Sequence, residues 1–186
     1  MARFPTTLDA APLQLVAWDP RYAAGVADAS NASFDALHTW MSWATELATE
    51  ASMLTVLAHG AQRFAHDLEW QYLMTEADGT VVGGTGLRPL PDPKSLEIGY
   101  WVRTDRTQRG YATASARALT SAAFSFLATC ERVEIHMDVA NLKSAAVPPR
   151  VGYWLEREED RPFLAPGHTG RGFIWVMDRA TWSANS

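Results

Sequence analysis

Hydrophobic and polar positions alternate with a period of two from residue 70, where Trp70, Tyr72 and Met74 share one face of an extended chain. This period indicates a β-strand. Asp78-Gly79 follows, and this dipeptide favours the left-handed backbone of a tight hairpin. The pattern therefore predicts that residues 81–88 return antiparallel to the first strand.

The same alternation recurs elsewhere in the chain. Over residues 131–139, Val133, Ile135 and Met137 alternate with charged or polar residues, which predicts a strand. Further strands are predicted at residues 13–18, 95–102, 153–155 and 172–177.

Helical periodicity marks two segments in the first third of the chain. Asp19-Pro20 is a helix-start signal before an alanine-rich segment. A second helical pattern runs from about residue 46 to residue 67. The aromatic cluster at residues 38–43 is expected to interrupt these helices. The predicted core face of the second helix consists of Met53, Val56, Leu57 and Phe64.

A third helix is predicted after Gly110, with apolar residues at steps of three and four. It joins the strands 95–102 and 131–139, and such a crossover places its two strands parallel in one sheet. Asn141 is predicted to cap a short helix that Pro148-Pro149 stops or kinks. The elements predict a single α/β domain over residues 1–186 with a mixed sheet. The apolar stripe of the third helix is Ala112, Ala116, Leu119, Ala123 and Phe126.

The turn before this helix is a candidate anion site. The N–H groups at a helix start lack intrahelical partners and carry partial positive charge, so an anion there gains hydrogen bonds and a favourable field. Gly110 allows the backbone to approach closely. Between residues 98 and 130 the only acid is Asp105, whereas the segment holds four arginines: Arg103, Arg106, Arg109 and Arg117. This excess of positive charge suggests a small polyanionic ligand.

Composition narrows the classes of function. The 186 residues carry a net charge of −5, with 47% hydrophobic and 20% charged residues, which is typical of a globular protein and argues against nucleic acid as a principal partner. No stretch approaches the ~20 apolar residues of a membrane span, and no apolar signal core begins the chain, so no membrane partner and a cytoplasmic location are expected. Cys130 is expected to be a packed thiol. No side-chain cluster has metal-ligand spacing, so no metal is expected.

Four features stand in a fixed order along the chain. They are Trp40-Met41-Ser42-Trp43, the strand Glu97-Ile98-Gly99-Tyr100-Trp101, the turn Thr107-Gln108-Arg109-Gly110-Tyr111-Ala112, and Asn141 with Ser144 and Gly152. In this order they resemble the GNAT N-acetyltransferases, in particular their RimJ/RimL-like branch. The turn resembles the family's pyrophosphate loop, Gln/Arg-x-x-Gly-x-Gly/Ala, except that Thr107 occupies the first position.

The resemblance implies an α/β (α+β) fold with a mixed, mostly antiparallel central sheet, flanking helices and a splayed pair of strands that binds acetyl-CoA. Acetyl-CoA would be the co-substrate, with its pyrophosphate on the amides of the turn and its pantetheine arm along residues 97–102. Arg103 and Arg109 are the arginines expected to pair with its phosphates. The implied cofactor-binding residues are Tyr100, Trp101, Val102, Gln108, Arg109, Gly110, Tyr111, Ala112, Thr113, Asn141 and Ser144.

The resemblance also implies catalytic roles. Many members of the family place a tyrosine seven residues after the asparagine to protonate the departing thiolate, but Pro148 stands there in this chain. Ser144 becomes the candidate acid, with a packing role as the alternative.

Glu97 is the candidate base, because the family often uses a carboxylate on this strand; a purely structural glutamate is the alternative. Other base candidates are His136, Asp138 and, in a later loop, His168. Together with Glu97, Trp40 and Trp43 are the candidate substrate-binding residues, unless they belong to the core.

These residues predict an enzyme that moves an acetyl group from acetyl-CoA to a primary amine by direct attack in a ternary complex. The expected acceptor is a protein N-terminal α-amine or a small-molecule amine, and a homodimer is left open. One alternative is a non-catalytic acyl-CoA-binding sensor or assembly subunit. Another is a nucleotide-phosphate binding module unrelated to acetyl transfer.

Overall fold

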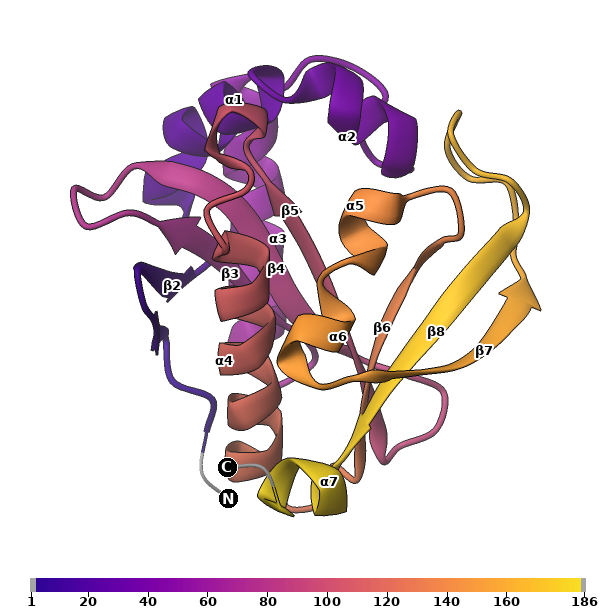
Figure 1. The fold of residues 1–186 in the computed structure, drawn as a ribbon. Coiled ribbons are helices and arrows are strands. Elements are labelled where there is room, and N and C mark those ends of the chain that lie inside the picture. Colours follow the sequence, from indigo (N-terminus) through magenta and orange to yellow (C-terminus); the bar gives the residue numbers. More distant parts are fainter. Residues whose placement is uncertain (1–2, 185–186) are drawn as a thin grey trace.

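A computed structural model describes residues 3–184 and contains an eight-stranded sheet in the order β1-β2-β3-β4-β5-β6-β8-β7 (Figure 1). All neighbouring strands are antiparallel except β5 and β6, which are parallel. The predicted mixed, mostly antiparallel sheet is confirmed. The strands are β1 (Thr7–Ala10), β2 (Leu13–Ala17), β3 (Trp70–Thr75), β4 (Val81–Pro89), β5 (Ser95–Val102), β6 (Arg132–Asp138), β7 (Trp154–Asp160) and β8 (Arg171–Asp178).

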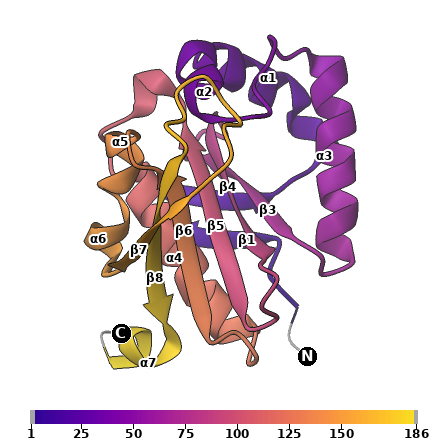
Figure 2. The same cartoon turned by 90° about the vertical axis from the view of Figure 1, so that its right-hand side faces the viewer.

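Helices lie on both sides of this sheet, with α3 and α4 on opposite faces (Figures 1 and 2). Leu119 and its neighbours on α4 bury one face of the sheet in the main core, whereas Leu57 of α3 packs with Leu73 and Val81 on the other. The helices are α1 (Ala23–Asn31), α2 (Phe34–Trp40), α3 (Glu50–Ala65), α4 (Tyr111–Phe126), α5 (Leu142–Ala145), α6 (Pro148–Val151) and α7 (Arg179–Ala184), with short 3₁₀ turns at Pro20–Tyr22 and Thr104–Arg106.

The hairpin between β3 and β4 forms where the sequence predicts it. Gly79 has a φ of 85°, a conformation that glycine adopts without steric cost. The Asp78 carboxylate accepts a hydrogen bond of 2.9 Å from the Thr80 amide, which closes the turn. The parallel pairing of β5 with β6 through α4 is also confirmed.

Strands β5 and β6 pair over only part of their length. Ser95–Ile98 of β5 lie opposite Arg132–Ile135 of β6. Beyond these residues β5 continues to Val102 and β6 to Asp138, but the two strands no longer pair with each other. The second half of β5 therefore has one edge without a neighbouring strand. This is the splayed strand pair that the resemblance implied.

The structure corrects several boundaries in the first third. Helix α3 begins at Glu50 because Thr49 and Ser52 form a reciprocal capping box there. Leu57 and Phe64 are buried as predicted, but Val56 is 42% exposed and Met53 is only half-buried. The aromatic cluster ends a helix and does not interrupt one, since α2 runs to Trp40.

Other elements carried too little signal to be predicted. Strand β1 has four residues and α7 has six. The two prolines stop α5 as expected, but Pro148 also begins α6, because proline suits the first turn of a helix.

Cys130 is a packed thiol as predicted: its side chain is buried, and burial raises the pKa of the thiol. Within residues 3–184, no helix has the length and apolar character needed to cross a bilayer.

Replacing Leu119 by alanine is expected to lower the free energy of unfolding by about 2–5 kcal/mol, because the side chain is fully buried between α4 and the sheet. Urea denaturation followed by circular dichroism measures the change. Ser121→Ala on the exposed side of the same helix is the control and should stay within about 0.5 kcal/mol of the wild type. Equal effects of the two substitutions would contradict the assignment of α4 to the core.

Candidate active site

A cleft opens where β5 and β6 separate. It has a volume of about 800 Å³, and its walls come from α2, α3, β4, β5, β6, the start of α5 and the loop between β7 and β8. Glycines leave space above the sheet at this point, because they carry no side chain. A Cβ on Gly84 would strike the Trp101 ring and one on Gly86 would strike the Gln71 side chain, whereas a Cβ on Gly99 would meet nothing within 4 Å. Gly99 therefore faces open space.

The structure brings seven of the fourteen predicted site residues to this cleft, from the end of α2 and the loop after it, from β5 and from the start of α5. Seven others lie outside its lining: Val102 continues along β5, the residues 108–110 lie in the turn before α4, and the residues 111–113 begin that helix. The predicted residues that line the cleft are Trp40, Trp43, Glu97, Tyr100, Trp101, Asn141 and Ser144.

Glu97 is buried on the floor of the cleft, with 7% of its surface exposed. Its Oε2 atom accepts a hydrogen bond of 2.6 Å from Arg88 and lies 3.3 Å from His136 Nδ1. Arg88 was missed in the sequence analysis. The signal was available, since Arg88 on β4 stands directly opposite Glu97 in the hairpin register.

A second pair of polar side chains occupies the opposite side of β5. The Tyr100 hydroxyl donates a hydrogen bond of 3.0 Å to the Ser144 carbonyl, and Ser144 Oγ lies 3.1 Å from the same hydroxyl. Burial raises the pKa of Tyr100 to about 12, so the phenol stays protonated near neutral pH. Asn141 caps α5 as predicted, accepting a hydrogen bond of 3.3 Å from the Ser144 amide.

The loop between β7 and β8 closes one side of the cleft by docking on the end of α2 (Figure 2). The Gly167 amide donates to the Thr39 carbonyl at 2.8 Å, and His168 Nε2 lies 3.2 Å from the Trp40 carbonyl. Asp138 accepts hydrogen bonds of 2.8 and 3.0 Å from the amide and hydroxyl of Thr169. His168 and Asp138, two of the alternative base candidates, thus have partners that anchor this loop.

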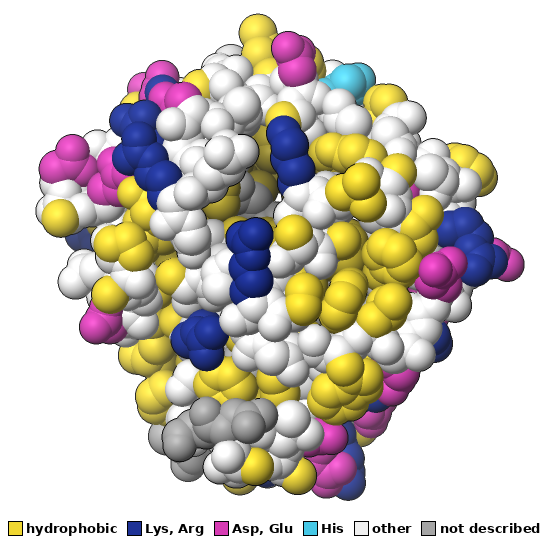
Figure 3. Space-filling view, in the orientation of Figure 1, with side chains coloured by type: hydrophobic (Ala, Val, Ile, Leu, Met, Phe, Trp, Pro, Cys, Tyr) yellow, Lys and Arg dark blue, Asp and Glu magenta, His cyan; other side chains and the backbone are white. Residues whose placement is uncertain are grey.

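The turn before α4 has the backbone geometry of an anion site. Gln108 and Gly110 have φ values of 63° and 80°. Gly110 is the N-cap residue of α4, so no side chain of the cap accepts a hydrogen bond from the first amides of the helix. The Ala114 amide donates to the Gly110 carbonyl at 2.9 Å, so the preceding amides lie before the intrahelical ladder. Successive N–H groups in such a turn form an anion-binding concavity. On the face that carries α4 and α5, Figure 3 shows Lys or Arg side chains around a hollow.

The arginines of this segment differ in their availability. Arg103 contacts the carboxylates of Asp28 and Asp105 at 2.5 and 2.9 Å, and only 19% of its side chain is exposed. These two contacts already neutralise its charge, so its pairing with a CoA phosphate stays a prediction that would require the guanidinium to leave the carboxylates. Arg109 is 51% exposed and lies 3.6 Å from Glu76, which leaves it the more accessible of the two.

Tyr111 contributes to the turn through its backbone only. Its side chain is buried, and its hydroxyl donates a hydrogen bond of 2.6 Å to Glu76.

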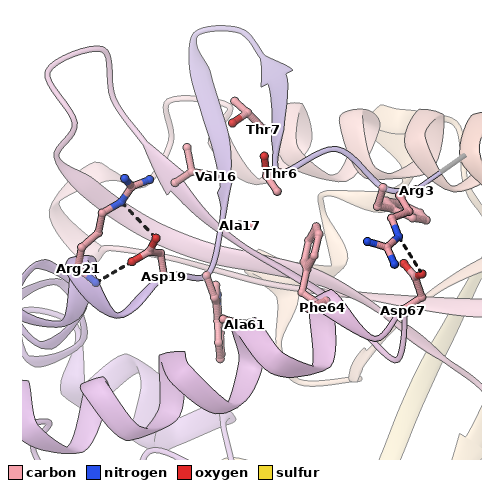
Figure 4. Close-up of a pocket in the computed structure, with 13 residues that line it drawn as sticks. Arg3, Thr6, Thr7, Val16, Ala17, Asp19, Arg21, Ala61, Phe64 and Asp67 are labelled. Carbon is pink, nitrogen blue, oxygen red and sulfur yellow. Dashed lines mark hydrogen bonds and ion pairs between the residues drawn. The ribbon is translucent and has the colours of Figure 1, made fainter.

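A smaller cavity of about 500 Å³ lies between the N-terminal segment, β2 and α3 (Figure 4). It is flanked by the ion pairs Arg3–Asp67 and Arg21–Asp19, at 4.0 and 3.5 Å. None of the predicted site residues lines it. The chemistry-bearing side chains described above belong to the larger cleft.

Comparisons with known proteins agree with this geometry. Residues 12–154 match the family described as Acetyltransferase (GNAT) domain. The chain is 39% identical over 80 residues to "Putative ribosomal N-acetyltransferase YdaF" of Bacillus subtilis, a match that spans 42% of this chain and 43% of that protein.

Solved structures share the fold. A RimL ribosomal-protein acetyltransferase in complex with coenzyme A superposes with a TM-score of 0.84 at 17% identity, over 94% of this chain and 99% of that chain. RimJ of Mycobacterium smegmatis, in complex with CoA-disulfide, gives a TM-score of 0.79 at 23% identity, over 90% and 82% of the two chains. The match over most of its length shows that this chain belongs to the GNAT acetyltransferase family and is an acyltransferase.

Proposed function

We propose that this protein is an N-acetyltransferase that uses acetyl-CoA and transfers the acetyl group to a primary amine by direct attack in a ternary complex. The observation that carries the proposal is the divergence of β5 from β6. It leaves a free backbone edge that ends at an anion-binding turn, and it places Glu97 and the Ser144–Tyr100 pair on opposite sides of that edge.

The cofactor fits this arrangement in three parts. The pyrophosphate is assigned to the amides of residues 108–113 and Arg109. The pantetheine arm is assigned to the unpaired edge of β5, with Asn141 beside it. A backbone N–H of residues 99–102 on that edge polarises the thioester carbonyl and stabilises the charge that develops on its oxygen. Acetyl-CoA supplies the activated acetyl group.

The residues of the cleft divide the proton transfers between them. The amine nitrogen forms a bond to the carbonyl carbon, the carbon–sulfur bond breaks, and Glu97 takes a proton from the nitrogen. Ser144 Oγ, which donates to the Tyr100 hydroxyl in this structure, turns to give its proton to the thiolate, and the neutral Tyr100 hydroxyl turns from the Ser144 carbonyl to restore it. Proton exchange with water then returns Glu97 and Tyr100 to their starting protonation states.

The acceptor belongs in the part of the cleft between Glu97 and the end of α2. Trp40, Trp43 and Trp101 line this region, and Trp43 is 55% exposed. A slender chain end with an apolar residue suits these aromatic walls better than a small polar amine does. This favours a protein N-terminal α-amine, the kind of acceptor suggested by the names of YdaF and RimL, over small polar amines.

The first test is an acetyl-transfer assay with acetyl-CoA and a panel of peptides and small amines, with release of the CoA thiol as the readout. Glu97→Gln is expected to lower kcat/KM by about 10²–10⁴-fold, because the amide cannot accept the proton. Glu131→Gln, at an exposed carboxylate outside the cleft, is the control. Thermal stabilisation by CoA without thiol release from any acceptor would favour a sensor instead.

Gly99→Val is expected to lower kcat/KM at least about tenfold while leaving the melting temperature unchanged. The new side chain would project into open space in the cleft, and valine suits a strand. Calorimetric titration with CoA would show whether the loss is in cofactor binding. Full activity in this variant would contradict the assignment of the substrates to this cleft.

The Ser144–Tyr100 pair predicts non-additive substitutions. Ser144→Ala and Tyr100→Phe should each lower kcat, and the double variant should lose little more than the worse single variant, because both interrupt one proton path. Steady-state kinetics of the four proteins completes the cycle. Strict additivity would mean that the two hydroxyls do not act together.

A further inference from the structure

Two carboxylates lie directly opposite each other on the floor of the cleft. Glu97 on β5 and Glu134 on β6 are register partners in the parallel pair, and 7% and 6% of their surfaces are exposed. Like charges at paired positions repel each other, and burial strengthens the repulsion. A cation between them would remove this conflict.

His136 contacts both carboxylates. Its Nδ1 atom lies 3.3 Å from Glu97 Oε2, its Nε2 atom lies 2.5 Å from Glu134 Oε2, and 10% of its side chain is exposed. A neutral imidazole carries a proton on one nitrogen only, so its other nitrogen would present a lone pair to a carboxylate oxygen. A ring with protons on both nitrogens presents an N–H group to each carboxylate.

The surrounding charges fit such a ring. Arg88 contacts Glu97 from β4, Arg132 contacts Glu134 at 2.5 Å, and Glu156 of β7 contacts Arg132 at 2.6 Å. With a cationic His136, the signs alternate along the whole row. On β8, the neighbour of β6 on the other side, the residue paired with His136 is Ile174, which does not titrate. His168, Arg161 and Asp138 line the same cleft.

The state of Glu134 agrees with this arrangement. Burial acts to raise the pKa of its carboxyl, but the hydrogen bonds from His136 and Arg132 outweigh burial and hold the pKa below its usual value. Glu134 is therefore an anion near neutral pH, so the contact at 2.5 Å has His136 Nε2–H as its donor.

We propose that His136 is a positioning residue: its doubly protonated ring, fixed by Glu134, holds Glu97 through Oε2 and leaves Oε1 to receive the proton of the acceptor amine. This inference rests on the proposed function. Arg88 contacts the same Oε2 atom, and within residues 3–184 no hydrogen-bond donor to Oε1 is found. His136 is then not itself the base, since it has no free nitrogen to accept a proton.

Long-range ¹H–¹⁵N spectra of the histidine rings test the protonation of His136 without any substrate. The His136→Asn variant identifies the signal by its disappearance. Both nitrogens of the wild-type ring should show the protonated signature at pH 7. A neutral tautomer would overturn the proposal. This measurement does not need activity, so it tests the protonation of His136 even if no amine is acetylated. Failure to acetylate any amine would instead contradict the proposed function.

Kinetics of two variants test the positioning role. An asparagine amide reaches about as far as Nδ1 and can still donate to Glu97, whereas a glutamine amide reaches about as far as Nε2 and can still donate to Glu134. His136→Gln should therefore lower kcat/KM by about 10–100-fold, and His136→Asn by a smaller factor. His66→Gln, at an exposed histidine outside the cleft, is the control.

The pH profile separates positioning from a purely structural role. A carboxylate that loses a donor is protonated at higher pH, so the acid limb of kcat/KM should move to higher pH in His136→Gln and move less in His136→Asn. Equal losses in the two variants with an unmoved acid limb would overturn the proposal.

Discussion

The parting of β5 from β6 after four paired residues is the constraint on which the rest of this structure depends. Inside a sheet, backbone N–H and C=O groups are satisfied by neighbouring strands. Beyond Ile98, β5 has no neighbouring strand on one side, so the N–H and C=O groups of this edge are free to bind a ligand with amide groups of its own. The helix that connects the two strands starts at the open end of the gap, so its unpaired amides face the region that is proposed to hold the charged end of the ligand.

The same parting determines which side chains meet. Successive residues of a strand point to opposite faces, so Glu97 and Tyr100, three positions apart, lie on opposite faces of β5. Glu97 joins Arg88 and His136, whereas Tyr100 joins Ser144. A base and an acid are thus held on the two sides of the edge proposed to bind the thioester. Gly84, Gly86 and Gly99 keep the face with Glu97 low enough for an acceptor to reach it.

Ionic contacts link neighbouring strands across the cleft floor. The row from Arg88 through Glu97, His136 and Glu134 to Arg132 spans three neighbouring strands. Buried charges are tolerated only when paired and hydrogen-bonded, and each member of this row has a partner of opposite sign when His136 is cationic. The loop after β7 is held by polar contacts: Asp138 accepts a hydrogen bond from the Thr169 amide, and His168 contacts the Trp40 carbonyl.

Local pattern by itself determined most of the elements of this protein, though not short ones such as β1 and α7. The alternation from Trp70, the Asp78-Gly79 turn and the apolar stripe on α4 are short-range signals. Strand β3 begins at the predicted residue, and β5 begins and ends at the predicted residues. The resemblance of the turn and of Asn141 with Ser144 also identified the family before any contact was known. Side-chain partners were not readable in this way. The partner of Arg103 is Asp28, 75 positions earlier, and the hydroxyl beside Ser144 comes from Tyr100, 44 positions away. Such contacts depend on which strands become neighbours and where they separate, and only the tertiary structure decided that, because pairing energy comes from residues distant in sequence.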